Sequence, residues 1–288
     1  MSQLLLGKPA ADALDIDTSA RAAALKEAGV CPMLAILRVG EREDDLAYER
    51  GALKRAEKNG IAVKQVVLPS ACSQKELMSE IDKLNNDDTV HGVLMFRPLP
   101  KTLDEETACE ALAPEKDVDG ITRGSMATAY AGMGSGYAPC TAESCIEILR
   151  YYNIETSGKN VAVIGRSQVI GKPVALLLMQ KSCNATVTVC HSRTADMADI
   201  TRRADIIIAA MGRAETITSE YCSEGQTVLD VGINWSEAKQ KLVGDVDFEN
   251  VESLVGAITP VPRGVGSVTT AVLCRHVIEA AEKTIAKS

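Results

Sequence analysis

The sequence predicts an α/β protein with two domains, because short apolar runs alternate with helix-length polar segments along a chain of 288 residues. Residues 161–164 form one such run, which is typical of a buried parallel strand, and a glycine turn after it opens a helix. Four more apolar runs follow at helix-length spacing, at residues 186–190, 205–209, 227–231 and 256–259. The second half of the chain is therefore expected to hold a parallel sheet.

The turn after residues 161–164 has the pattern G-x-S-x-x-x-G, formed by Gly165, Ser167 and Gly171. It is a relative of the G-x-G-x-x-G loop, with serine at the second small position. Glycine lets the backbone approach a pyrophosphate, the serine hydroxyl can bond a phosphate oxygen, and the helix N-terminus offers free N–H groups. An ordinary strand–turn–helix would fit the bare pattern too. The strands that follow favour a Rossmann-type dinucleotide-binding domain.

Composition and charge exclude several classes of protein. Nine cysteines show neither C-x-x-C pairs nor a regular framework, which predicts reduced thiols and no metal site. No apolar run approaches the roughly twenty residues of a membrane span, and no signal peptide is apparent, so we expect a soluble, cytoplasmic protein. A net charge of −8 without a basic block argues against nucleic acid, although local basic residues remain available to an anionic cofactor.

The first half of the chain alternates helices and strands in the same way. Ser73 and Glu76 form a capping-box pattern for a helix that runs through Leu84. A strand at residues 90–96 leads into the loop Arg97–Pro100, at the edge of the sheet where open α/β folds bind ligands. We also expect helices at residues 10–26, 47–59 and 105–112, strands at 33–39 and 61–68, and a polar loop at 40–45.

Glycine density marks the expected domain boundary, in the stretch Gly132–Thr141. We place the first domain at residues 1–141 and the second at residues 142–269, with a helix at residues 142–152 leading into it. The final helix, within residues 270–288, is expected to pack back on the first domain. Before the boundary, Asp117 and Asp119 lie in an acid-rich loop, where they are either surface turn formers or cleft residues.

A series of motifs resembles one enzyme family, and the match covers nearly the whole chain: Tyr48 on its helix, PLP after a strand, PEKDVDG, PCT, GRSxxxGKP, CHSRT, DVGIN, GDVDF and ITPVPxGVG. The sequence is similar to the methylenetetrahydrofolate dehydrogenase/cyclohydrolase family. The resemblance implies two three-layer α/β domains flanking a cleft, usually as a homodimer, with NAD(P) on the second domain and folate between the two. The implied reactions are oxidation of 5,10-methylenetetrahydrofolate to the methenyl cation and hydrolysis of that cation to 10-formyltetrahydrofolate.

The resemblance also implies roles for residues of the first domain. Tyr48 matches the tyrosine that stacks on the folate, and Asp119 matches the aspartate that binds the pterin; both are our candidates for catalytic residues. An aromatic face suits a flat heterocycle, and a carboxylate suits its amino and ring N–H donors. The alternative for Tyr48 is an amphipathic surface tyrosine. Further substrate contacts are expected at Met95, Phe96, Arg97, Pro262, Gly264 and Gly266, the last three in a loop with Val265 that closes over the substrate.

For the cofactor, the family motifs match nine residues: Gly165, Arg166, Ser167, His191, Ser192, Arg193, Gly212, Ile233 and Thr269. His191 is equally compatible with a packed histidine at the end of a strand. No Asp or Glu follows the strand at residues 186–190 to accept from a ribose 2′-hydroxyl. Arg193 and Arg166 could instead pair with a 2′-phosphate, which favours NADP, with NAD as the alternative. Either arginine could also be solvated or bind the pyrophosphate.

The chain departs from the family at four positions: Ala52 replaces a lysine, Phe96 a glutamine, Arg263 a glycine and Ser267 a proline. Oxidation gives a cation delocalised over two nitrogens, so it needs positioning beside the nicotinamide more than an acid or base. Hydrolysis needs water activation and proton transfer, which the missing lysine and glutamine serve in the family.

We therefore expect a dehydrogenase with weak or no cyclohydrolase activity. Lys54 faces about 120° away from Tyr48 around the helix, and Arg97 stays protonated, so neither is an obvious replacement base. The alternatives are a fully bifunctional enzyme and a folate-binding homologue without catalysis.

Overall fold

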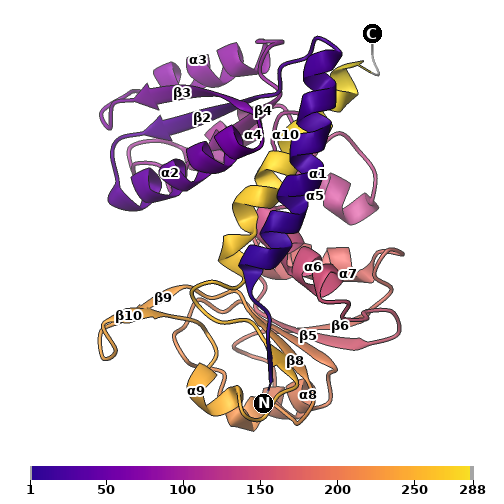
Figure 1. Cartoon of the computed structure of the whole chain (residues 1–288). Coiled ribbons are helices and arrows are strands. Elements are labelled where there is room, and N and C mark those ends of the chain that lie inside the picture. The colour runs from indigo at the N-terminus through magenta and orange to yellow at the C-terminus, as the bar shows by residue number, and fades with distance from the viewer. Residues whose placement is uncertain (1, 286–288) are drawn as a thin grey trace. The chain divides into compact units, whose positions relative to one another are not determined.

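The structure is a computed structural model that describes residues 2–285, and it divides into two compact units (Figure 1). The three-stranded unit comprises Asp12–Cys140 and the chain from Thr270 onward. The six-stranded unit comprises the chain up to Ala11 and Thr141–Thr269. Each is an α/β fold built on its own parallel sheet.

The sheet of the three-stranded unit has the order β3-β2-β4, with β3 at Ala62–Leu68, β2 at Met33–Val39 and β4 at Gly92–Met95. Alternate residues of β2 face opposite sides. One set joins the apolar cluster made with α3 (Gln74–Asn85) and α4 (Glu105–Ala111). On the other side, Arg38 pairs with Glu49 of α2 (Glu43–Lys58) at 3.0 Å, with both side chains buried. Helices thus cover both faces of the sheet.

Local sequence features near the first turn account for where several helices begin. The capping box is confirmed, because the Ser73 hydroxyl accepts from the Glu76 N–H and the Glu76 carboxylate accepts from the Ser73 N–H. Helix α2 begins at Glu43, inside the loop expected at residues 40–45, and three acidic residues in its first turn suit the positive end of the helix dipole. Helix α1 (Gly7–Glu27) also begins early, since Pro9 is tolerated in a first turn.

Helix α5 (Arg123–Ala131) was absent from the sequence prediction. Its two ends nevertheless carry ordinary signals. The Thr122 side chain accepts from the Ser125 N–H, and Gly132 ends the helix in the left-handed conformation, at φ 70°. The last helix of this unit is α10 (Thr269–Ile285), and its Val277 packs against Gly92 of β4.

The six-stranded unit has a wholly parallel sheet of order β1-β11-β8-β7-β5-β6. From β5 the chain moves outward to β6, then returns to the other side of β5 for β7. This reversal beside β5 is the topological switch point of a Rossmann-type sheet, where ligands bind. The strands are β5 (Asn160–Ile164), β6 (Thr186–Cys190), β7 (Ile206–Ala209), β8 (Thr227–Asp230) and β11 (Ala257–Ile258). The helices are α6 (Cys140–Tyr151), α7 (Gly171–Met179), α8 (Met197–Arg202) and α9 (Phe248–Val251).

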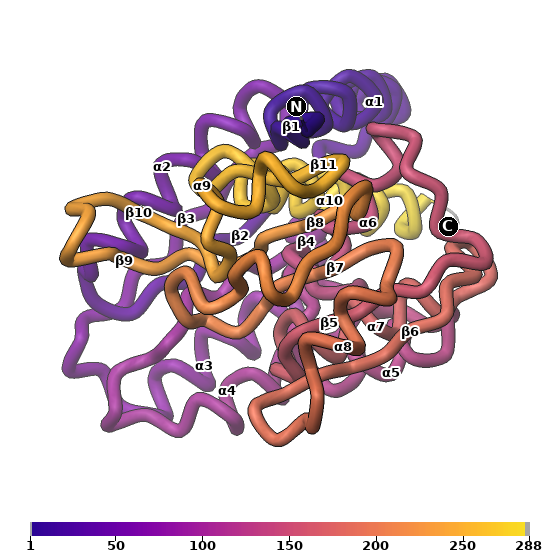
Figure 2. The backbone as a smooth tube through the Cα atoms, turned by 90° about the horizontal axis from the view of Figure 1, so that it is seen from below, coloured from indigo at the N-terminus to yellow at the C-terminus, as the bar shows by residue number. Residues whose placement is uncertain are grey.

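Two features of this unit were not anticipated. Strand β1 (Gln3–Leu4) pairs with β11, so these two residues lie in the six-stranded sheet, and the expected place of this segment in the first domain, residues 1–141, is wrong. A two-residue strand carries no periodic signal from which to predict it. The second feature is the hairpin of β9 (Asn234–Ser236) and β10 (Lys241–Val243), which extends outward from the unit (Figure 2).

Neither a membrane span nor a metal cluster occurs in residues 2–285. No helix there is long and apolar enough to cross a bilayer, and no group of three or more His, Cys, Asp or Glu residues is arranged to hold a metal ion. All nine cysteines are free thiols, and only Cys31 is exposed.

Candidate active site

The parallel sheet of the six-stranded unit collects four loops at one edge. They follow the carboxyl ends of β5, β6, β7 and β8 and span residues 165–170, 191–194, 210–213 and 231–233. Eight of the nine expected cofactor residues lie in them: Gly165, Arg166, Ser167, His191, Ser192, Arg193, Gly212 and Ile233. The ninth, Thr269, is buried at the start of α10.

The loop after β5 fits a dinucleotide phosphate. Gly165 has φ 131°, and a Cβ there would lie 2.1 Å from the Ala210 carbonyl oxygen. A Cβ on Gly171 would lie 2.2 Å from the Gly165 carbonyl oxygen, so both positions require glycine. The Ser167 hydroxyl oxygen accepts from the N–H groups of Ile170 and Gly171, at 3.1 and 3.3 Å. Its O–H can still donate to a phosphate oxygen.

The loop after β6 is a closed turn. The His191 N–H donates to the Thr194 hydroxyl at 2.9 Å, and the His191 Nδ1 accepts from the Arg193 N–H at 3.2 Å. Ser192 and Arg193 are exposed, as is Arg166 in the neighbouring loop. Residues 191–195 contain no carboxylate, so this turn offers cations and hydroxyls to a ribose.

The loop after β7 is filled by a carboxylate from elsewhere in the unit. Three successive N–H groups, of Met211, Gly212 and Arg213, donate to the fully buried Asp245 at 2.5, 2.9 and 2.8 Å. Such a row of N–H groups forms a nest that binds anions. The Asn234 amide donates to the same carboxylate at 2.9 Å. The Gly212 N–H is therefore engaged within the protein, and any cofactor contact at Gly212 must use its other atoms.

A second buried carboxylate, Asp230 at the end of β8, lies next to the first. It accepts from the N–H groups of Gly232, Asp245 and Val246 at 2.9–3.0 Å. Burial, with a smaller contribution from the charge of Asp245, raises the pKa of Asp230 to about 7, although the N–H donors oppose the shift. A Cβ on Gly244 would lie only 1.8 Å from the Asp230 carboxylate. Sequence analysis missed this pair, although the DVGIN and GDVDF motifs contain both residues.

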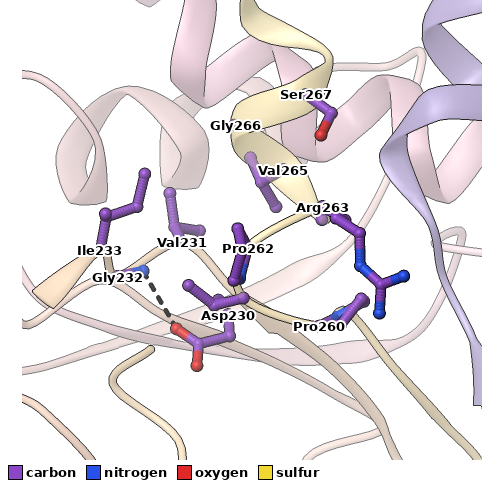
Figure 3. Close-up of a pocket in the computed structure, with 12 residues that line it drawn as sticks. Asp230, Val231, Gly232, Ile233, Pro260, Pro262, Arg263, Val265, Gly266 and Ser267 are labelled. Atoms are coloured by element: carbon purple, nitrogen blue, oxygen red, sulfur yellow. Dashed lines mark hydrogen bonds between the residues drawn. The ribbon is translucent and has the colours of Figure 1, made fainter. Parts of the chain in front are cut away.

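The Pro/Gly loop after β11 borders a pocket of about 250 Å³ in the six-stranded unit (Figure 3). A Cβ on Gly264 would lie 2.5 Å from the Pro260 carbonyl oxygen, so the chain turns tightly there. The Gly7 N–H donates to the Arg263 carbonyl at 2.8 Å and ties the loop to the N-terminal segment. The residues that line the pocket include three expected substrate contacts, Pro262, Gly264 and Gly266. They also include Arg263 and Ser267, where the chain differs from the family, and Val265, Ile233 and Asp230.

In the three-stranded unit, Tyr48 of α2 meets Phe96, which follows β4. Their rings are perpendicular, with centroids 5.7 Å apart. Ala52, one turn along the helix from Tyr48, is 1 % exposed and Phe96 is 7 % exposed, so apolar groups occupy both positions where the family has lysine and glutamine. Lys54 is exposed, as the helical spacing predicts. Met95 lies in the core against α3 and α4, away from an open surface.

The two aspartates of the acid-rich loop, Asp117 and Asp119, lie in different environments. Asp117 is fully buried and accepts from the N–H groups of Ile121 and Thr122 at 3.0 and 2.7 Å, so it shapes the loop and is not a surface turn former. Asp119 is partly exposed and hydrogen-bonds to the Cys140 thiol. Burial, followed by the charge of Asp117, raises the pKa of Asp119 to about 6, while Arg97 opposes the shift.

Asp119 and Tyr48 are close enough to influence each other. Burial raises the pKa of the Tyr48 phenol well above 10, and the charge of Asp119 is the next largest cause. The three-stranded unit thus presents an aromatic ring beside a carboxylate, and the six-stranded unit presents a glycine- and serine-containing loop at its switch point. These features define a nucleotide-dependent α/β enzyme.

Comparison with known proteins identifies the family. Residues 5–119 match the catalytic domain of tetrahydrofolate dehydrogenase/cyclohydrolase, and residues 139–285 match the NAD(P)-binding domain of the same family. The chain belongs to the tetrahydrofolate dehydrogenase/cyclohydrolase family, and its six-stranded unit is an NAD(P)-binding domain.

The chain is 46% identical over 283 residues to the "Bifunctional protein FolD" of Clostridium botulinum, covering 98% of this chain and 99% of the relative. The FolD dehydrogenase/cyclohydrolase of Campylobacter jejuni superposes with a TM-score of 0.93 at 36% identity, covering 99% and 100% of the two chains. The FolD of Trypanosoma brucei, solved with NADP and an inhibitor, has a TM-score of 0.90 at 33% identity, covering 99% and 98%. These relatives favour the bifunctional alternative over a weak cyclohydrolase.

Proposed function

We propose that the protein catalyses both reactions of its family, oxidation of 5,10-methylenetetrahydrofolate with a nicotinamide dinucleotide and hydrolysis of the methenyl product to 10-formyltetrahydrofolate. The observation that carries this proposal is the 46% identity, over 98% of the chain, to a relative named as bifunctional. The two family domains, one catalytic and one for NAD(P), are both present and support it.

In the oxidation, the protein's task is to position the reactants. Tyr48 offers its ring to the folate and Asp119 accepts from the pterin N–H donors, while the Gly165–Gly171 loop and the turn at His191–Arg193 hold the dinucleotide. The bound nicotinamide supplies a hydride acceptor. The substrate loses one hydride and becomes a cation shared by two nitrogens, so no protein base is required.

A dehydrogenase with weak hydrolysis is the second candidate, and a specific observation favours it. Buried Phe96 contacts the Tyr48 ring, and buried Ala52 follows Tyr48 by one helical turn, at the two positions where the family has an amide and an amine. Positioned proton transfer contributes about 10²- to 10⁴-fold to a rate, so its loss would leave hydrolysis far behind oxidation.

Assaying both half-reactions on the purified chain decides between the candidates. Methenyltetrahydrofolate that decays, in an enzyme-dependent way, as fast as it forms supports the bifunctional enzyme; methenyltetrahydrofolate that accumulates supports the second candidate. In the second case, Ala52→Lys with Phe96→Gln should raise hydrolysis, whereas Ala52→Met with Phe96→Gln, of similar bulk but without an amine, should not. If the protein binds folate but catalyses neither reaction, it is a folate-binding homologue without catalysis.

Three further expectations belong to the same proposal. The cofactor is NADP in preference to NAD, because the turn after β6 offers Arg193 and no carboxylate. The protein is a homodimer, which light scattering on the purified chain would test. Its place is the cytoplasm, which fractionation of the source cells would test.

A further inference from the structure

Arg263 has an unusual backbone conformation for a long side chain. Its φ is 83°, whereas the five other non-glycine residues with positive φ in the described part of the chain lie between 49° and 54°. Those five fall in the ordinary left-handed helical region or at its border, and Arg263 lies beyond it. The family has glycine at this position, which would adopt the same angle without strain. Because glycine would serve the fold equally well, an arginine kept at this strained backbone angle points to a function of its side chain.

The loop around Arg263 is fixed on both sides. The Arg263 carbonyl accepts from the Gly7 N–H at 2.8 Å, and the following Gly264 carbonyl accepts from the Ser267 N–H at 3.0 Å. A Cβ on Gly7 would lie 2.1 Å from the Gly264 carbonyl oxygen, so the two segments are in close contact. The backbone that carries the guanidinium is therefore held in one place before any ligand binds.

The guanidinium itself has no partner among the residues that the structure describes. Among residues 2–285 it forms neither an ion pair nor a side-chain hydrogen bond, although the protein carries a net charge of −8. It extends past Pro260, apart from the Asp230 carboxylate, at the rim of the pocket (Figure 3). Asp230 already accepts three backbone N–H groups.

We infer that Arg263 forms an anion subsite, in which its guanidinium binds a carboxylate or phosphate oxygen of a ligand that occupies this pocket. A guanidinium presents paired N–H donors that match either group. The inference rests on the proposed function, which offers two anionic sources: the carboxylates of the folate's glutamate tail and the phosphates of the dinucleotide. A glycine at this position, as in the family, supplies no charge, so the subsite is a property of this chain.

Steady-state kinetics on the full chain can test the subsite and identify the anion. The variants are Arg263→Gly, Arg263→Lys, which keeps the charge, and Lys181→Gln, which removes one charge from an exposed position of the same unit. Each is measured with 5,10-methylenetetrahydrofolate, with the 5,10-methylenetetrahydropteroate analogue that lacks glutamate, and with varied dinucleotide. Loss of one charge-assisted contact should raise a KM about tenfold with little change in kcat.

The outcomes are distinct. A rise in KM for the glutamate-bearing substrate but not for the pteroate, partly reversed in Arg263→Lys, identifies the tail carboxylate; a rise in KM for the dinucleotide identifies a phosphate. If neither KM rises more than in Lys181→Gln, the subsite does not exist. A wild-type protein that reduces no nicotinamide would refute the proposed function instead. Titrating wild type and Arg263→Gly with tetrahydrofolate and with NADP would then still measure the subsite directly.

Discussion

The carboxylate of Asp245 occupies the turn that carries Gly212, and it accepts the Gly212 N–H at 2.9 Å. A nest of three N–H groups at the ligand-binding edge of the sheet is thereby filled from within the protein. Asp245 also accepts from Asn234, at the start of the β9–β10 hairpin, so one buried side chain fixes the loop after β7 relative to the loop after β8.

Asp245→Asn should therefore destabilise the protein and weaken dinucleotide binding. The amide removes the negative charge and turns an NH₂ group towards N–H donors, and hydrogen bonds to a charged group contribute about 1.5–3 kcal/mol each. We expect a loss of about 3 kcal/mol in the free energy of unfolding, measured by urea denaturation. The control is Asp247→Asn, which affects only a partly exposed aspartate bonded to Asn250. Equal losses in the two variants would contradict the role given to Asp245.

The pKa of Asp230, raised by burial to about 7, predicts how stability depends on pH. Between about pH 4 and pH 7 the folded state retains a proton that the unfolded chain has released, so the free energy of unfolding falls as pH rises. Over the part of this shift that lies between pH 5 and pH 8, the fall is about 3 kcal/mol. Urea denaturation at pH 5 and pH 8 would measure it.

The matched comparison is Asp230→Asn, which cannot titrate. His91, whose pKa burial lowers, contributes the opposite slope in this range, and Asp119 contributes the same slope as Asp230. Both are present in wild type and variant, so the difference between the two pH profiles isolates Asp230. Parallel profiles would mean that Asp230 does not titrate between pH 5 and pH 8.

Much of the six-stranded sheet could be predicted because its strands are short, apolar and separated by helix-length segments. The run at residues 186–190 was placed correctly as β6, and residues 33–39 were placed correctly as β2 in the three-stranded sheet. Strand β1 and the β9–β10 hairpin were not found, since segments of two or three residues carry no periodicity. The position of β1 depends on its pairing partner β11, which lies far along the chain.

In the candidate site, too, some features could be predicted from the sequence and others could not. Loops that follow strands can be read from the sequence, because strand ends in a parallel sheet share an edge. The sequence does not show which polar group accepts from which N–H, because the two partners can be far apart in the chain. Asp245 and Gly212, for example, are 33 positions apart. Similarly, Asp117 and Asp119 look alike in sequence, and only burial shows that the first holds the loop while the second remains partly open.

Asp119→Asn should weaken folate use by about one to two decades in kcat/KM, because charge-assisted hydrogen bonds to the pterin contribute about 1.5–3 kcal/mol. The measurement is nicotinamide reduction with varied methylenetetrahydrofolate, alongside binding of tetrahydrofolate. Glu115→Gln, in the same loop but exposed, is the control. Unchanged folate kinetics together with a loss of stability would make Asp119 a structural residue of the loop.

Arg263→Gly should stabilise the protein while it removes the proposed anion subsite. Glycine adopts a φ of 83° without steric strain, and relief of an unfavourable backbone conformation is worth about 1 kcal/mol, reduced by the greater entropy of glycine in the unfolded chain. The Tm of Arg263→Gly, measured by thermal unfolding, should therefore be higher than the Tm of Arg263→Ala. An alanine variant as stable as the glycine variant would show that the backbone here is unstrained.

The choice of cofactor is the last prediction, and it depends on the turn after β6. An NAD site of the usual kind places Asp or Glu there to accept from the ribose 2′-hydroxyl, whereas this chain has His191, Ser192 and Arg193. A guanidinium can pair with a 2′-phosphate through two hydrogen bonds, so we expect kcat/KM to be at least about tenfold higher with NADP than with NAD. Arg193→Ala and Arg166→Ala, tested separately, should reveal by a narrowed preference which cation binds the phosphate, and Lys181→Gln should leave the preference unchanged. A clear preference of the wild type for NAD would overturn the assignment, and it would mean that these arginines are solvated or bind the pyrophosphate that both cofactors share.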